Sequence, residues 1–290
     1  MKRLVFLVSL LLICFFMFSY VSAQEITHKV KTGTISGKLM IKGGGPMAGG
    51  HVFIFNDATG PPPSRGKYWR VPDDVVSLDN EGKFSIELPA GRYYLGAIKR
   101  VSEKKSIGPP DEGDFFFASA DEKGMPKAYI IKEGEKIDIG IISEAMPFKR
   151  ADVKFGDGIT SIEGVVLDVE GKPVEGAVIF AYMAPTRIGK PIFASERTGK
   201  NGKYILRVHE GGKYYLRVRS VYGGGPPQAG EIIGDYGEKE PVAVVLKSGK
   251  KLRGINIKVR RFAGRGPKAL EKKCEKNNLR GLTESQEGGA

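Results

Sequence analysis

Histidines are the first residues to test for chemistry, because zinc sites and acid–base catalysts depend on them most often. The chain contains three of them, His28, His51 and His209. A zinc peptidase needs two ligands close together, as in His-x-x-Glu, with a third ligand further along. These histidines lie far apart, each in a different segment, and none has a partner at ligand spacing. We therefore predict no metal site.

Motifs for nucleophilic catalysis and phosphate binding are also missing from the sequence. There is no Gly-x-Ser-x-Gly elbow and no P-loop. The glycine runs 43–45 and 223–225 lack the Lys-Ser/Thr pair of a phosphate cradle, so we interpret them as turns. The acidic pairs 73–74 and 111–112 do not follow a calcium-loop pattern. We predict no catalytic residues, no cofactor and no enzymatic activity.

Aromatic residues in three long segments are the main candidates for binding. The segments, with their candidates, are 56–74 (Tyr68 and Trp69), 101–126 (Phe115, Phe116 and Phe117) and 221–239 (Tyr222 and Tyr236). We predict these segments to be loops, and loops longer than about 12–15 residues are usually functional or disordered. Two interpretations remain open: the rings cover an end of the fold or a junction within it, or they form an exposed platform for a protein or a sugar.

A row of basic side chains is the second candidate surface. Its members, which strand alternation places on outward faces, are Arg207, Arg217, Arg219, Lys258 and Arg260. The formal net charge of +13 favours acidic partners such as anionic polysaccharide or lipid head groups. We expect no nucleic-acid partner. A solvated sheet face without a ligand is the alternative interpretation; Arg217 and Arg219 are the candidate binding residues of this row.

The elements that position these residues belong to an internal sequence repeat of two copies. Ile35-Ser36-Gly37 and a turn ending at Pro46 are answered by Ile162-Glu163-Gly164 and a turn ending at Pro173. Gly91-Arg92-Tyr93-Tyr94-Leu95 is answered by Gly212-Lys213-Tyr214-Tyr215-Leu216, and Gly108-Pro109-Pro110 by Gly225-Pro226-Pro227. We call residues 33–146 the first copy and residues 159–262 the second copy. Residues 147–158 are predicted to be a linker, and 263–290 a charged flexible tail.

Each copy is predicted to contain seven short strands separated by Gly, Pro, Asn and Asp. The predicted strands lie near 34–41, 51–56, 75–79, 83–88, 92–100, 127–132 and 137–143, and near 160–168, 176–183, 192–198, 203–209, 212–220, 240–246 and 252–260. Apolar residues alternate along them: Tyr214, Leu216 and Val218 share one face. One buried and one solvated face indicate two tandem seven-stranded antiparallel Greek-key β-sandwich domains.

The N-terminus predicts export. A short basic head, an apolar run over 4–18 and small residues before Gln24 are typical of a signal peptide, residues 1–23. A retained membrane anchor and a lipoprotein at Cys14 are the alternatives. Cleavage would lower the net charge to +11 by removing Lys2 and Arg3, and would leave a chain that spans no membrane. It would also leave Cys274 as the single cysteine, either unpaired or forming a disulfide-linked dimer.

These residues resemble the carboxypeptidase regulatory-like domain, a prealbumin-like (transthyretin-like) sandwich. The second copy carries the pattern through these positions: Gly164, Asp168, Gly171, Pro173, Gly176, Ala177, Gly202, Tyr204, Gly212, Tyr214 and Leu216. The first copy departs from it at 43–50, where extra glycines replace the usual turn. The resemblance implies a non-catalytic module, and Tyr93 and Tyr214 resemble its tyrosine-corner position, in which a buried ring bonds nearby backbone.

The function we predict is a non-catalytic, exported binding or structural protein of the bacterial envelope, periplasmic or extracellular. Its two sandwiches would present loops to a protein partner. The absence of Asn-x-Ser/Thr acceptors agrees mildly with a bacterial envelope. The alternative is a carbohydrate-binding module of the starch-binding-like fold, in which Tyr68 and Trp69 stack on the rings of a cell-surface glycan.

Overall fold

A computed structural model describes residues 31–102, 107–153, 156–185, 189–223, 225–237 and 239–264. Its contacts group the described residues from Thr32 onward into one compact unit. The predicted signal peptide, Cys14, His28, Cys274 and nearly all of the predicted tail lie outside the described residues. Within the described part, no helix is both long and apolar enough to cross a membrane.

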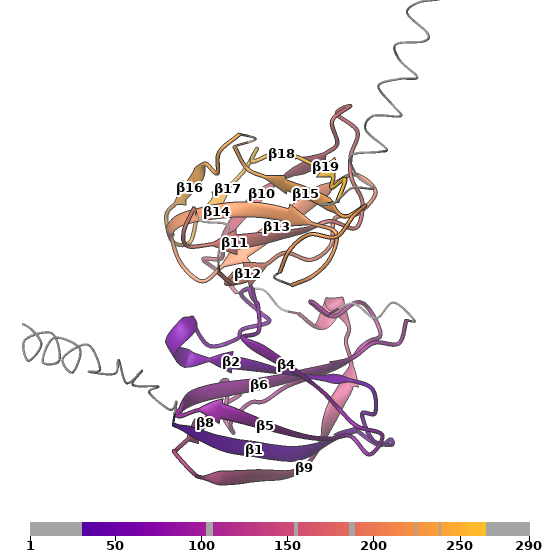
Figure 1. Cartoon of the computed structure of the whole chain (residues 1–290), viewed down its shortest axis with the longest axis vertical. Helices are drawn as coiled ribbons and strands as arrows, with labels where there is room; N and C mark the ends of the chain where they lie inside the picture. The colour runs from indigo at the N-terminus through magenta and orange to yellow at the C-terminus, as the bar shows by residue number, and fades with distance from the viewer. Residues whose placement is uncertain are drawn as a thin grey trace, which may run out of the picture. The chain divides into compact units, whose positions relative to one another are not determined.

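The structure is almost entirely β, which confirms the predicted class. The first part of the chain, coloured indigo to pink in Figure 1, contains β1 (Thr32–Ile41), β2 (His51–Asn56), η1 (Asp57–Thr59), β3 (Trp69–Arg70), β4 (Asp74–Ser77), β5 (Lys83–Pro89), β6 (Gly91–Lys99), β7 (Phe115–Ala118), β8 (Ala128–Ile131) and β9 (Lys136–Pro147). Strands β1, β5 and β9 lie side by side, and so do β4, β2 and β6.

The second part repeats this order with shorter final strands. It contains η2 (Arg150–Asp152), β10 (Thr160–Leu167), β11 (Val178–Tyr182), β12 (Phe193–Ala194), β13 (Lys203–Val208), β14 (Gly212–Arg219), β15 (Ile232–Asp235), β16 (Ala243–Leu246), β17 (Lys251–Leu252), β18 (Ile257–Lys258) and β19 (Arg260–Arg261). Here β13 and β17 flank β10, while β12, β11, β14 and β15 form another sheet.

The predicted strands are present, with four kinds of difference. The strand predicted at 192–198 is reduced to the two residues of β12. Short strands β3, β7 and β15 lie inside the segments that were predicted to be loops. The strand predicted at 252–260 is broken into β17, β18 and β19. The pairing is not purely antiparallel, because β1 runs parallel to β9, and β10 runs parallel to β17 and β18. Apolar alternation predicts a buried face but not the direction of the neighbouring strand, which explains the last difference.

Each copy has its own hydrophobic core. One cluster joins side chains of β1 and β5 to those of β2 and β6, including Ile35, Phe84 and Ile54. The other joins β10 and β13 to β11 and β14. In β14, Tyr214, Leu216 and Val218 are buried as the alternation predicted. Burying an aliphatic side chain contributes about 1.5–3 kcal/mol, so a shift of one residue in register would be strongly unfavourable.

Two tyrosines confirm the predicted tyrosine corner in both copies. The Tyr93 hydroxyl donates to the carbonyl of Pro89 at 2.8 Å, and the Tyr214 hydroxyl donates to the carbonyl of Glu210 at 2.9 Å. Both acceptors lie four residues earlier in the chain, and both rings are buried. Each tyrosine therefore fastens the entry of a central strand, β6 or β14, to the turn before it.

The first turn of each copy also matches, although the first copy carries extra glycines there. Met40 bridges Pro46, and Leu167 bridges Pro173 in the second copy. Gly82 and its counterpart Gly202 lie against this turn, and both have a positive backbone φ, +76° and +67°. A Cβ at Gly82 would lie 2.4 Å from the Leu39 carbonyl oxygen, so glycine is required there for steric as well as conformational reasons.

Candidate binding site

Strand β3 carries a segment of the first copy to a sheet edge of the second copy. Trp69 pairs with Ala194, and Arg70 pairs with Phe193, in antiparallel register with β12. The N–H of Val71 adds a bond to the Ile192 carbonyl at 2.8 Å. The segment lies between β2 and β4 in sequence, so the first copy completes a sheet in which every other strand belongs to the second copy.

Tyr68, next to β3, is part of the second copy's core and is not exposed. Its side chain is 3% exposed, and its ring lies edge-on to Phe193 with centroids 5.1 Å apart. Its hydroxyl donates to the Pro62 carbonyl at 2.7 Å. Burial raises the pKa of Tyr68 to about 12. This ring is therefore unavailable for stacking on a ligand.

Trp69 forms a cluster of three rings with Phe116 and Phe148. The centroids lie 6.2 Å from Trp69 to Phe116, 6.1 Å from Trp69 to Phe148, and 5.9 Å between the two phenylalanines, all edge-to-face. The indole N–H also points to a Glu196 carboxylate oxygen at 3.4 Å. Phe148, which falls in the predicted linker, is buried. Edge-to-face pairs contribute about 0.5–1.5 kcal/mol each beyond burial.

Arg70 fixes the path of the segment that carries these rings. It is 6% exposed and its guanidinium donates to the carbonyls of Gly60 and Pro61 at 2.9 and 2.6 Å. A further donor bonds the Asp73 carboxylate at 2.9 Å, and the guanidinium lies 5.6 Å from the Phe55 ring centroid. The segment 56–73 is therefore an ordered structure around one buried cation, which its glycine- and proline-rich sequence did not indicate.

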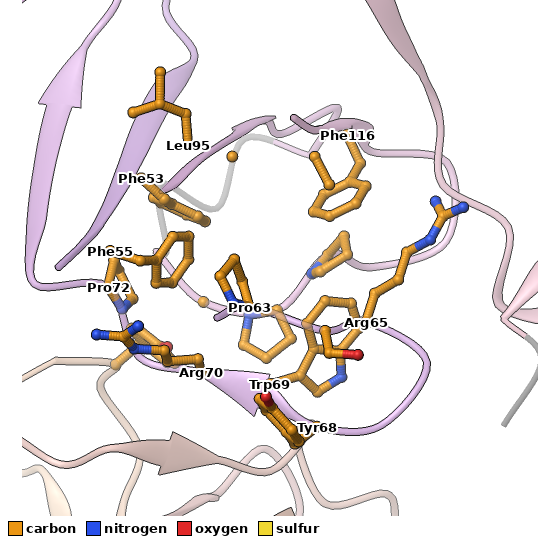
Figure 2. Close-up of a pocket in the computed structure, with 17 residues that line it drawn as sticks. Phe53, Phe55, Pro63, Arg65, Tyr68, Trp69, Arg70, Pro72, Leu95 and Phe116 are labelled. Atoms are coloured by element: carbon orange, nitrogen blue, oxygen red, sulfur yellow. The ribbon is translucent and has the colours of Figure 1, made fainter. Parts of the chain in front are cut away.

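An apolar pocket of about 60 Å³ opens beside the three-ring cluster (Figure 2). Its walls include Phe53, Phe55, Pro63, Pro109 and Pro110. Four of the predicted binding residues also line it: Tyr68, Trp69, Phe116 and Tyr222. The structure thus brings candidates from all three predicted loop segments to one place. Figure 2 shows Phe53 and Phe55 on one side of the pocket and Phe116 and Trp69 on the other.

A buried arginine holds the Gly-Pro-Pro segment of the first copy. Arg100 donates to the Asp114 carboxylate at 2.5 Å and to the carbonyls of Gly108 and Pro109 at 3.1 and 2.9 Å. Asp114 also accepts from the N–H of Asp111 at 2.8 Å. This arrangement, which we call the arginine lock, places Pro109 and Pro110 against the pocket.

The second copy contains the same arginine lock, built from Arg219 and Glu231. Arg219 Nε donates to Glu231 at 2.5 Å, and another donor reaches the carbonyls of Gly223 and Gly225 at 3.0 Å. Even the closing backbone bonds agree: Gly113 donates to the Phe148 carbonyl, and Gly230 to the Phe262 carbonyl, both at 2.8 Å. Both locks were missed because their partners are far apart in sequence.

Arg219 therefore corrects the prediction for one member of the outward basic row. It is 6% exposed and its ion pair with Glu231 raises its pKa. Burial alone would raise the pKa of Glu231, but hydrogen bonds from Arg219 and from the Gln228 N–H lower it overall. Arg217 is partly exposed, donates to Asp235 at 2.8 Å and lies 5.8 Å from the Tyr182 ring centroid. Both arginines line a groove with Lys258 and Arg260, away from Arg207.

Of the remaining aromatic candidates, Phe115, Phe117 and Tyr236 do not line the pocket. Phe117 is buried in the first copy's core, and Phe115 packs against that core. Tyr236 packs against the second copy's core. Tyr222 lines the pocket while its ring contacts Phe180 at 5.2 Å, and burial raises its pKa. Most of the predicted rings thus have a packing role. Tyr68 and Phe117 are buried, and the other five are partly exposed.

The described residues give the site no recognisable acid–base or metal chemistry. Among them, no three His, Cys, Asp or Glu side chains are grouped so as to hold a metal ion. His51 lies at the start of β2, where its ring nitrogen is 3.4 Å from the Ser77 hydroxyl, and burial followed by the charge of Arg100 lowers its pKa. His209 follows the end of β13 and contacts the Tyr68 ring. The arrangement can bind a partner by apolar contact.

Comparison with known proteins gives no family assignment. No family model and no curated protein matches the sequence. Among solved structures, the TIE protein of Bacillus anthracis is 15% identical over 79% of this chain and 34% of its own, with a TM-score of 0.24. A streptococcal ancillary pilin is 12% identical over 80% and 63%, with a TM-score of 0.24. A DUF3823 family protein from Bacteroides uniformis is 11% identical over 73% and 98%, with a TM-score of 0.25.

This chain spans about a third of the Bacillus protein and less than two thirds of the pilin. TM-scores at this level support no argument from those proteins to this one.

Proposed function

We propose that this chain is a non-catalytic, exported protein of the bacterial cell envelope that binds a protein partner through the apolar pocket beside Trp69. The observation that carries this proposal is the convergence of Trp69, Phe116 and Tyr222, from three separate segments, on one apolar pocket. Pockets of this kind, lined by aromatic residues, are where the dominant side chains of protein interfaces insert. The export itself rests on the signal-peptide pattern in the sequence.

The size of the pocket favours a protein side chain over a sugar. Sites for small molecules usually measure about 300–1,000 Å³, and a cavity of about 150 Å³ is needed to hold benzene. At about 60 Å³ the pocket accepts the tip of an aliphatic side chain but no ring. Sugar binding would also need an open aromatic face, and Tyr68, one of the two proposed stacking residues, is 3% exposed.

The charge around the pocket indicates an acidic partner surface. Arg65, which lines the pocket, is exposed, and the chain as a whole carries a formal net charge of +13. Complementary charge mainly accelerates encounter and fixes orientation, while the inserted side chain supplies most of the affinity. We therefore expect a partner segment with one aliphatic residue among carboxylates.

The test begins with a photo-crosslinking residue at Ala118, an exposed wall residue of the pocket, in bacteria that export the protein. The captured protein is then purified and titrated against the wild type by calorimetry. Ala118→Leu should fill the pocket, and Arg65→Glu should reverse the charge beside it. We expect each change to weaken binding about tenfold, the equivalent of about 1.4 kcal/mol.

Lys42→Glu is the matched control, because it makes the same charge reversal at an exposed residue that does not line the pocket. Equal binding by the wild type and the pocket variants, or capture of no exported protein, would overturn the proposal. A glycan array with Trp69→Ala tests the carbohydrate alternative: saturable glycan binding that this change abolishes would assign the site to sugar instead.

A further inference from the structure

A groove larger than the pocket beside Trp69 lies on the outer face of β10 and β13, and the proposed function does not use it. It measures about 550 Å³, within the range of about 300–1,000 Å³ for ligand sites. Its lining includes Arg150, Lys203, Arg207 and Arg253 together with the carboxylates of Glu163 and Glu196. The cations exceed the carboxylates, so the groove attracts anions.

The side chains of this groove are held in place by ion pairs. Arg253 Nε lies 3.2 Å from a Glu163 oxygen, and Arg150 pairs with Glu196. The Asn256 side-chain oxygen accepts from the N–H of Val165 at 3.0 Å, which leaves the amide NH₂ of Asn256 as a further donor toward the groove. The site therefore offers donors and acceptors together on a sheet surface.

The equivalent face of the first copy has a different charge, so the fold does not require the basic groove. In the second copy Gly164 of β10 pairs with Tyr204 of β13, and in the first copy Gly37 of β1 pairs with Phe84 of β5. These two pairs occupy corresponding positions of the repeat. At this alignment Arg207 corresponds to Glu87, while Lys203 corresponds to Lys83. A basic residue in one copy and an acidic residue in the other share the same structural position, and both copies keep the same strand pairing.

From these observations we propose that the β10–β13 groove binds a carboxylate-bearing glycan. Arginine presents planar paired donors that match a carboxylate. Glu163 and Glu196 can accept further hydrogen bonds, since a carboxylate offers about four acceptor positions, and sugar hydroxyls supply the donors. A polyphosphate has no such donors to offer Glu163 and Glu196. Ile205, 45% exposed in the groove, offers an apolar contact for the C–H face of a sugar ring.

Oligogalacturonate is the probe, and neutral oligogalactose of the same length is its uncharged counterpart. Calorimetry with the full-length protein should give saturable oligogalacturonate binding that weakens as salt is raised, and at least about tenfold weaker binding of the neutral sugar. The double variant Arg207→Gln with Arg253→Gln should weaken oligogalacturonate binding about tenfold or more. If Arg207→Gln impairs folding, Arg253→Gln alone is measured instead. The Arg253 side chain is 76% exposed, so its replacement should leave the fold intact.

Lys203→Gln and Lys83→Gln form the matched pair, since they remove the same charge at corresponding positions of the two copies. We expect only Lys203→Gln to weaken binding. Equal loss from both changes, equal affinity for the neutral sugar, or no saturable binding would overturn the proposal. Tighter binding of polyglutamate, sensitive to the same variants, would overturn it in favour of an acidic protein segment.

Discussion

The two copies differ most in the segment that follows their second strand. In the first copy residues 57–73 leave β2, pass through β3 and return to β4, whereas the corresponding connection of the second copy, between β11 and β12, spans only 183–192. The tyrosine corner, the first turn and the arginine lock occur in both copies. Features that both copies share hold the sheets together, whereas the long connection that carries Tyr68, Trp69 and Arg70 belongs to the first copy alone.

The largest effect should come from removing a first-copy residue that stabilises the second copy. Tyr68→Ala deletes a buried ring from the core that contains Phe193 and Tyr214. Loss of a buried aromatic ring typically lowers the free energy of unfolding by about 3–5 kcal/mol. Hydrogen exchange measured by mass spectrometry should show lost protection in β11, β12 and β13.

Tyr129→Ala is the control for this change, because Tyr129 is a buried ring of the first copy's own core. Its loss of protection should appear in β6 and β8 instead. If Tyr68→Ala left the second copy fully protected, the contribution of β3 to that sheet would be negligible, and the comparison between the copies would fail.

The next largest effect concerns the arginine locks. Glu231→Gln leaves buried Arg219 without its carboxylate, and breaking a buried pair costs roughly 3–5 kcal/mol. Asp114→Asn removes the buried carboxylate of Arg100 but leaves the Asp111 carboxylate 3.3 Å away, so chemical denaturation should show an equal or smaller loss. Asp235→Asn removes the partly exposed partner of Arg217 and should cost less than about 1 kcal/mol. Equal losses in all three variants would argue against burial as the reason.

The Glu231 lock also predicts a dependence on pH. Because the folded-state pKa of Glu231 lies below its ordinary value of 4.5, its contribution to stability is present above pH 4.5. That contribution disappears as the pH falls through the folded-state pKa. The difference in unfolding free energy between the wild type and Glu231→Gln should therefore shrink in acid, and a difference that grew in acid would contradict the assignment.

A smaller effect than that of breaking an arginine lock should come from the tyrosine corners. Tyr93→Phe and Tyr214→Phe each remove one hydroxyl that bonds a carbonyl, at a cost of about 1–2 kcal/mol. Thermal unfolding should show comparable shifts for the two variants. Markedly unequal shifts would mean that the hydroxyl bond of one corner contributes little to stability, despite the matching geometry.

The sequence predicted the strands well where side chains alternate over several residues. Predicted strands such as 83–88 and 203–209 lie within a residue or two of β5 and β13. Strand β3 has two residues, too few for any period, and it exists because an edge of the second copy is available to pair with it. Parallel pairing of β1 with β9 was missed, since burial constrains the face of a strand but not the direction of its neighbour.

For the candidate site, the sequence indicated which residues could bind a partner but not whether each side chain is buried or exposed. The sequence singled out Trp69, Phe116 and Tyr222, and the structure brings them together at one pocket. It placed Arg219 on an outward face by alternation, but the lock with Glu231 covers that position. It gave no signal for Arg70 or Arg100, because several of their acceptors are backbone carbonyls, which no residue type encodes.

The pairing of β3 with β12 means that the repeat in the sequence is not a unit that can be excised. A fragment cut at 159–262 would lack Tyr68 and would expose the edge of β12, with its unused N–H and C=O groups. Open sheet edges of this kind promote aggregation. The second copy therefore depends on a strand and a core side chain that its own repeat does not encode.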